Sequence, residues 1–266
     1  MGNLTNYAEN KLLDHILMND AYNRPANLFI ALCDADPGEA ATGGSISEPS
    51  GGAYARQPND DWTVAASRAA ASSVAVTFPA ATAGWGLLSH FAILDTLTLA
   101  TGNVIAYGPM TPNKTITTSD VLEIAVGDLD VSFNAAGVSD YAANALLDHL
   151  FYDTAFTQPT SLFIALSTAT ILDSDTGTTI SEPGQNYART LHTNYTIAAA
   201  GASANSGAVV FPAATGGNWG TMIDIGIMNT LTTGNLLLHS ALTVSKAVDL
   251  ADIAQFADGL IDITMD

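Results

Sequence analysis

Apolar residues recur at helical spacing in two places along the chain. Between residues 7 and 16 they return every three or four positions, while Glu9, Lys11 and Asp14 mark the opposite, polar side. A second apolar stripe of the same kind covers residues 141–150. The pattern therefore predicts one helix at each place, with Glu9, Lys11 and Asp14 facing solvent in the first.

The rest of the chain has the pattern of short strands. Residues 28–32 and 162–166 are apolar runs bounded by turn residues, which predicts strands buried on both faces. Apolar and polar residues alternate at 129–133 and at 261–265, which predicts strands with one buried face. Further strands, separated by Gly, Pro, Asn, Asp and Thr, are predicted at residues 54–57, 74–78, 87–94, 104–107, 115–118 and 121–126.

The two helices and the strands that follow them belong to a duplicated sequence. Leu-Leu-Asp-His at residues 12–15 and Leu-Phe-Ile-Ala-Leu at 28–32 both recur 134 positions later. After slips of one or two residues, Tyr-Ala-Arg, Phe-Pro-Ala-Ala-Thr and Trp-Gly also occur in both halves in the same order. We therefore predict two domains, residues 1–134 and 135–266, joined by a short seam of small residues.

One helix and several short strands in each half predict a mainly β fold. A parallel α/β sheet needs a helix between successive strands, and each half offers only one helix. We expect two tandem antiparallel β-sandwich units of jelly-roll type, each with one N-terminal helix.

Composition narrows the range of partners. The 266 residues are 48% hydrophobic, which is enough apolar material for a core, and the formal net charge is −19. Such an acidic surface repels phosphate backbones and anionic lipid headgroups, so we expect no nucleic-acid and no membrane partner. The first residues lack the pattern of a secretory signal, and the single cysteine, Cys33, cannot form an internal disulfide.

The residue patterns of common enzymes and metal sites are absent from the sequence. It contains no H-E-x-x-H, P-loop, G-x-G-x-x-G or G-x-S-x-G motif, and its five histidines form no close pair. The acidic loops 34–36 and 173–175 could offer oxygen ligands to calcium, but they lack the full ligand series of an EF-hand. We interpret them as solvated loops, and we expect no catalytic activity, no cofactor and no metal.

Two pairs of repeated residues are the candidate functional positions. Arg56 and Arg189 follow Tyr-Ala in the two halves, in a chain with only seven Lys and Arg residues. Each could bind a partner's carboxylate, but we prefer a role in tying loops together, because repetition in both halves fits maintenance of the fold. Trp85 and Trp219 could stack on a glycan, but a packed corner is the preferred interpretation.

The order of these motifs resembles a family of tailed-bacteriophage virion proteins, described as tail-fibre or head-decoration proteins, with single or duplicated β-sandwich units. The resemblance covers nearly the whole chain. It implies a structural protein of the virion, made in the host cytoplasm, with no enzymatic activity and no catalytic residues. It further implies contact with the major capsid protein or other virion proteins, and a homo-oligomer on the particle.

Within that family, length separates two roles. A long tail fibre usually needs coiled-coil heptads, collagen-like triplets or many repeats, whereas this chain offers two units. We therefore expect capsid decoration, as a cement or head-fibre protein. The alternatives are a tail-fibre or receptor-binding component and, from a different class, a carbohydrate-binding module.

Overall fold

The computed structural model describes residues 2–134 and 136–265. Each sequence repeat begins with one helical segment, as predicted. The first is α1 (Asn6–Leu17), and the second is α2 (Asp140–Leu147), which continues without a break into the π-helical turn η1 (Asp148–Tyr152). No described helix is both long and apolar enough to cross a bilayer.

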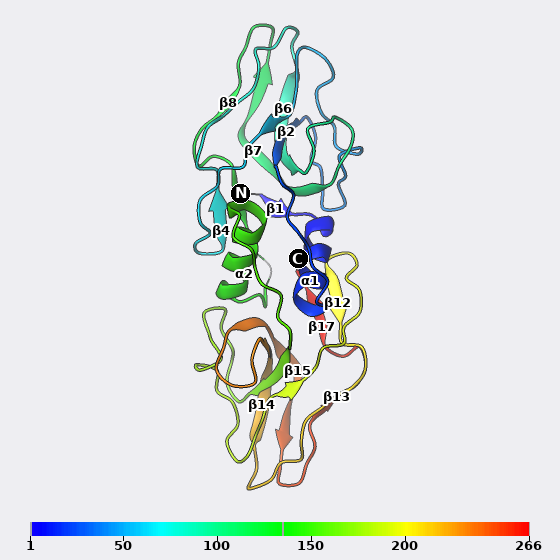
Figure 1. Cartoon of the computed structure of the whole chain (residues 1–266), viewed down its shortest axis with the longest axis vertical. Helices are drawn as coiled ribbons and strands as arrows, with labels where there is room; N and C mark the ends of the chain where they lie inside the picture. The colour runs from blue at the N-terminus through cyan, green and yellow to red at the C-terminus, as the bar shows by residue number, and fades with distance from the viewer. Residues whose placement is uncertain (1, 135, 266) are drawn as a thin grey trace. The chain divides into compact units, whose positions relative to one another are not determined.

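Strands make up most of the regular structure, and all of them except β1 follow the helix of their repeat (Figure 1). Those of the first repeat are β1 (Asn3–Leu4), β2 (Phe29–Cys33), β3 (Gln57–Pro58), β4 (Ala69–Ala71), β5 (Val76–Thr77), β6 (Gly86–Leu94), β7 (Val104–Ile116), β8 (Glu123–Ile124) and β9 (Asp130–Ser132). Those of the second are β10 (Phe163–Ser167), β11 (Thr190–Leu191), β12 (Ala202–Ala204), β13 (Val209–Val210), β14 (Gly220–Met228), β15 (Leu236–Val248), β16 (Gln255–Phe256) and β17 (Asp262–Thr264).

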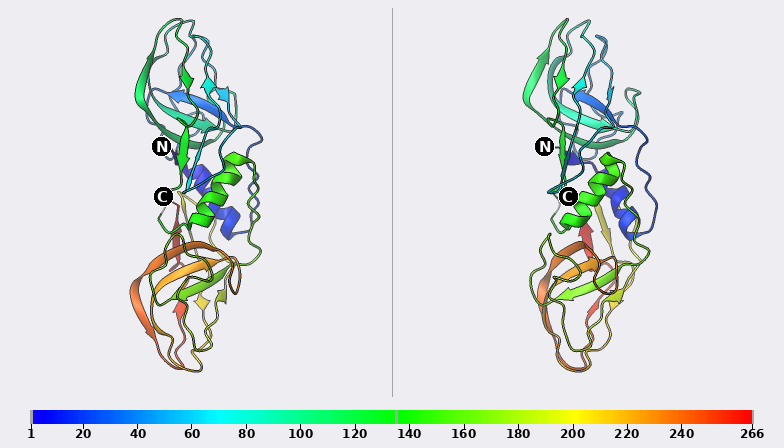
Figure 2. Two further views of the ribbon diagram at one scale, coloured as in Figure 1. Left: turned by 90° about the vertical axis from the view of Figure 1, so that its left-hand side faces the viewer. Right: turned by 60° about the vertical axis from the view of Figure 1, so that its left-hand side comes forward.

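Each repeat has one main antiparallel sheet and two short strand pairs (Figure 2). The main sheets have the orders β1-β7-β6-β2-β3 and β11-β10-β14-β15, and the short pairs are β4-β9, β5-β8, β12-β17 and β13-β16. The predicted class, mainly β with two tandem antiparallel units and one N-terminal helix each, is confirmed. The jelly-roll description stays a prediction.

The buried positions follow the predicted patterns in the strands. Residues 30–32 and 164–166 are buried, and so are the alternating apolar residues of 129–133 and 261–265. Several predicted strands are shorter than expected: only Gln57 of residues 54–57 and two residues of 121–126 are paired. The short alanine-rich strands β4 and β12 were not predicted, because a run of alanines has no alternation to detect.

The strands predicted separately at 104–107 and 115–118 are one strand, β7. Gly108, Pro109 and Pro112 lie between them and suggested a turn. Beyond Tyr107, however, β7 pairs only with β6, and a strand edge without a neighbour tolerates proline.

The compact units differ from the predicted ranges, residues 1–134 and 135–266, in the helical segments. Unit 1 comprises Met1–Leu12, Asn23–Asn134 and Asn144–Phe156, and unit 2 comprises Leu13–Tyr22, Ala135–Ala143 and Thr157–Asp266. The strands of each repeat stay together in one unit. The end of each helical segment belongs instead to the unit built on the other repeat's strands.

Candidate functional site

Arg56 lies at the centre of a buried polar cluster in unit 1. The residue is 1% exposed, and Nε and Nη2 donate to the carboxylate of Glu48, with an Nη2 to Oε2 distance of 2.6 Å. Nη1 donates to the carbonyl oxygens of Thr96, Thr98 and Thr101, at 2.9 to 3.1 Å. One guanidinium therefore holds the turn that joins β6 to β7 against the loop that carries Glu48.

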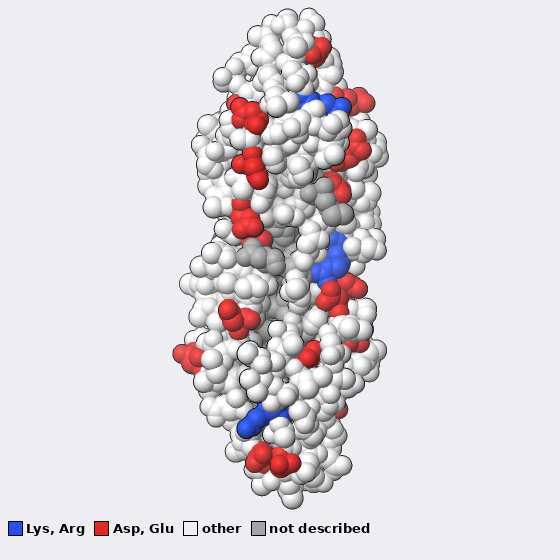
Figure 3. All heavy atoms as spheres, turned by 180° about the vertical axis from the view of Figure 1, so that it is seen from behind, with Lys and Arg blue, Asp and Glu red and all other residues white. Residues whose placement is uncertain are grey.

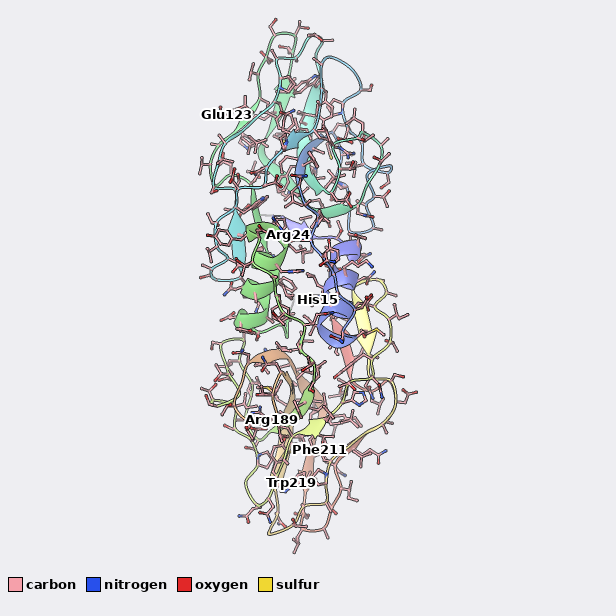
Figure 4. All side chains as sticks on the ribbon, viewed as in Figure 1. His15, Arg24, Glu123, Arg189, Phe211 and Trp219 are labelled. Atoms are coloured by element: carbon pink, nitrogen blue, oxygen red, sulfur yellow. The ribbon has the colours of Figure 1, made fainter. Side chains whose placement is uncertain are left out.

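Arg189 repeats this arrangement in unit 2, where Figure 4 labels it. Nε and Nη2 both donate to Glu182 at 2.9 Å, and Nη1 donates to the carbonyl oxygens of Thr230 and Thr233. Nη2 also donates to the carbonyl oxygen of Gly177 at 2.7 Å. The two repeats thus use the same side chain for the same connection.

Both guanidinium groups are fully engaged inside their own units. Each nitrogen of Arg56 has an acceptor among Glu48 and nearby carbonyl oxygens, and Arg189 is used in the same way. A partner's carboxylate would have to displace Glu48 or Glu182, each of which already forms a bidentate ion pair with its arginine. This geometry favours the loop-anchoring interpretation over an interface role.

A tyrosine connects each cluster to an inner strand of its sheet, β2 in unit 1 and β10 in unit 2. The hydroxyl of Tyr54 donates to Oε1 of Glu48 at 2.9 Å and accepts the N–H of Leu32 at 2.9 Å. The hydroxyl of Tyr187 accepts the N–H of Leu166 at 2.7 Å. Burial, with the nearby acid, raises the pKa of both phenols above its usual value. Each hydroxyl therefore stays protonated and able to donate.

Trp85 and Trp219 are buried beside these tyrosines. The ring of Trp85 packs edge-on against the ring of Tyr54, with 5.4 Å between the ring centroids. Its Nε1–H donates to the carbonyl oxygen of Gly52 at 2.9 Å. The Trp219 ring meets Tyr187 edge-on at 5.1 Å. Neither indole presents an open face on which a sugar could stack, so the geometry favours the packed corner.

Repeated aspartates, which sequence reasoning missed, bond to backbone in the helical segments. Oδ1 of Asp148 accepts the N–H of Ala65 at 2.7 Å in unit 1, and Oδ1 of Asp14 accepts the N–H of Ala198 at 2.8 Å in unit 2. The prediction that Glu9 and Asp14 face solvent is wrong, because both are buried and this bond holds Asp14 in its buried position. The repeated Leu-Leu-Asp-His motif was the available signal.

The neighbouring histidines of the same motif also bond to backbone. Nδ1 of His15 accepts the N–H of Tyr22, and Nδ1 of His149 accepts the N–H of Phe156. Across the described ranges, no three His, Cys, Asp or Glu side chains come together as metal ligands would. In one of the acidic loops considered for calcium, Oδ1 of Asp173 lies 2.8 Å from Nε2 of His239.

A family comparison connects this geometry to a known group of proteins. The family described as Podophage GP4 fiber I protein gp80 matches residues 3–132 and again residues 137–264. The chain belongs to this family. The two matches coincide with the two repeats, and the resemblance inferred from the motifs is confirmed. No curated protein matches the chain.

Membership in this fibre family establishes the general role of the protein. It is a structural protein of a phage virion, and as a virion component it associates with other virion proteins. The buried clusters around Arg56 and Arg189 are thus parts of a virion protein whose repeated motifs tie its own loops together.

The reactivity of Cys33 tests whether the core of this fibre-family protein excludes reagents from the solvent. The thiol is fully buried, and burial, followed by the charges of Glu48 and Asp34, raises its pKa from 9.0 to about 12. Since the thiolate is the reactive form, we expect the native protein to resist iodoacetamide at pH 8, with alkylation about a thousandfold slower than in denaturant. Mass spectrometry measures both rates, and rapid labelling of the native chain would contradict a closed core.

Proposed function

We propose that the chain is a non-enzymatic fibre subunit on the surface of the virion. The observation that carries this proposal is the match of a fibre protein family to both repeats. The hydrogen bonds of Arg56 and Arg189 within their own units also support it, because they give the repeated motifs a structural role. The protein is made in the host cytoplasm and acts on the particle as a homo-oligomer.

The acidity of the protein supports a position on the outside of the particle. Seven basic and 26 acidic residues give a net charge of −19, and acidic side chains are spread in separate groups over the face in Figure 3. Many like-charged copies repel one another and stay soluble at high local concentration. The partners are proteins of the virion, rather than nucleic acid or membrane.

Capsid decoration is the second candidate, and the size of the helices favours it. The longest helical segment in the described part of the chain is α2 with η1, residues 140–152, and α1 has 12 residues, so that part contains no coiled-coil stalk. A fibre made from such units gains length only through further copies or other proteins. A decoration protein, in contact with the major capsid protein, needs no such length.

Locating the chain on purified virions tests both candidates. Cryo-electron microscopy finds its density, and quantitative mass spectrometry gives its copy number relative to the major capsid protein. We expect density within fibres and a copy number well below that of the capsid protein. Density spread over the shell at a comparable copy number would favour decoration, and virions without the chain would contradict both.

The proposed lack of catalysis has its own test. Purified chain is incubated with esters, polysaccharides and peptidoglycan, and product release is measured. We expect no turnover above that of heat-treated protein. Turnover that a single carboxylate or histidine substitution abolishes would show that the protein is an enzyme.

A further inference from the structure

Unit 2 contains an apolar groove of about 840 Å³ between the edge of β15 and the loop and strands of residues 252–264. Apolar side chains of β14, β15, β16 and β17 line it, among them Met222, Ile225, Ile227, Leu238, Phe256 and Ile263. Along its rim lie the exposed apolar side chains of Val244, Ile253 and Leu260. All of the lining residues belong to unit 2.

Two strand edges border this groove. β15 is the last strand in the order of its sheet. Residues 137–139 bond to residues 237–239 along its outer edge, and beyond His239 nothing in the described part of the chain pairs with this edge. β17 pairs with β12 through Ile263, opposite Ser203, and the N–H of Met265 donates to Gly201. Because successive residues of a strand point their backbone groups to opposite sides, Asp262 and Thr264 direct theirs away from β12, toward the groove.

Unit 1 fills the same place with its own chain. The N–H of Gly2 donates to the carbonyl oxygen of Asp130 at 2.8 Å, and the N–H of Ser132 donates back to Gly2 at 3.0 Å. β1 continues this segment and pairs with β7. The fit is close: a Cβ on Gly2 would lie 3.0 Å from the Phe91 ring and 2.9 Å from the carbonyl oxygen of Tyr107. An extended segment therefore bonds to both strand edges of unit 1.

Unit 2 pairs residues 137–139 with β15 much as unit 1 pairs β1 with β7. Among the described residues, however, it leaves the edge of β17 open, for two reasons. Ala136 precedes the Val138–Leu238 bridge as Gly2 precedes Leu4, but among the described residues no backbone hydrogen bond joins Ala136 to β17. In addition, Ile225 pairs with β10 where Phe91 pairs with β2, so the floor of unit 2 lacks the phenyl ring. Thr264 is consequently exposed, whereas its counterpart Ser132 is buried.

We propose that this groove binds an extended segment of another virion protein, which adds as a strand between β17 and the part of the β15 edge beyond His239. The strand edges supply backbone hydrogen bonds, and the apolar floor selects a segment whose inward side chains are apolar. Lys246, Asp252 and Asp262 all line the groove, so the positive charge of the lysine offsets one of the two negative charges and little net charge repels a peptide. The proposal depends on the virion-surface role proposed above, because that role supplies the partner.

Reconstitution on particles assembled without this chain tests the proposal. Purified full-length chains are added to such particles, and the bound amount is measured. Val244→Glu places a charge on the rim of the groove, and Ile225→Phe supplies the ring that fills unit 1. The matched control is Ile197→Glu, because Ile197 is 74% exposed outside the groove and Val244 is 78% exposed.

We expect Val244→Glu and Ile225→Phe to lower binding by about tenfold or more, while Ile197→Glu stays within about twofold of the wild type. All three variants should melt near the wild-type temperature. On wild-type particles, the amide of Thr264 should exchange more slowly with solvent than in the isolated chain.

The proposal would be overturned by normal binding of both groove variants, by an unprotected Thr264 amide on the particle, or by a small molecule retained in the groove of the purified chain. Equal loss of binding in Ile197→Glu would also overturn it, because acidity alone would then explain the loss. Failure of the wild-type chain to bind would instead contradict the proposed function, so the two failures are distinguishable.

Discussion

Arg56→Ala is expected to lower the free energy of unfolding of unit 1 by about 3–5 kcal/mol. The substitution leaves the buried carboxylate of Glu48 without its cation and removes the donors to the carbonyl oxygens of the turn between β6 and β7. Removing one member of a buried ion pair destabilises a protein more than removing both, because the remaining charge is left buried without a partner. Urea denaturation followed by circular dichroism measures the effect.

Two further variants separate charge from geometry at this site. Arg56→Lys keeps the positive charge but lacks the planar fork, so we expect it to recover only part of the loss. Arg189→Ala should cost less than Arg56→Ala, because the side chain of Glu182 is 23% exposed and that of Glu48 is 7% exposed. Normal unfolding of Arg56→Ala, together with lost binding to particles, would show that Arg56 is an interface residue.

Phe151→Ala, in the second sequence repeat, is expected to destabilise unit 1 by about 3–5 kcal/mol. The Phe151 side chain is fully buried, and its ring lies 4.6 Å from that of Trp62, between ring centroids. Truncation to alanine removes this packing and leaves a cavity among the residues of unit 1. Hydrogen exchange by mass spectrometry should show faster exchange in β2 and β6 than in β10 and β14.

The reciprocal variant is Leu17→Ala, in the first sequence repeat. Leu17 is buried and belongs to unit 2, so its truncation should speed exchange in β10 and β14 first. Each variant therefore serves as the control for the other, because the two substitutions are expected to speed exchange in opposite units. If each substitution loosened the strands of its own repeat instead, the assignment of the helix ends to the opposite units would be contradicted.

Much of the fold was readable from local patterns in the sequence. The alternation at 129–133 identified buried residues, because neighbouring side chains of a strand point to opposite faces. The repeated Tyr-Ala-Arg and Trp-Gly motifs identified the residues that gather around Arg56 and Arg189. What they could not supply was the identity of the acceptors, since Glu48 and the carbonyl oxygens of 96–101 come from separate loops.

The sequence by itself determined the duplication, the mainly β class, the two helices and the candidate residues, because each depends on spacing between near neighbours. Only the tertiary structure decided which strands each helical segment covers. An apolar stripe on a helix predicts that this face is buried, but it does not predict which strands cover it. Asp14 and Asp148 bond to residues more than 80 positions away in the sequence. The open groove of unit 2 was likewise decided in three dimensions, where Ile225 and Ala136 leave space that Phe91 and Gly2 fill in unit 1.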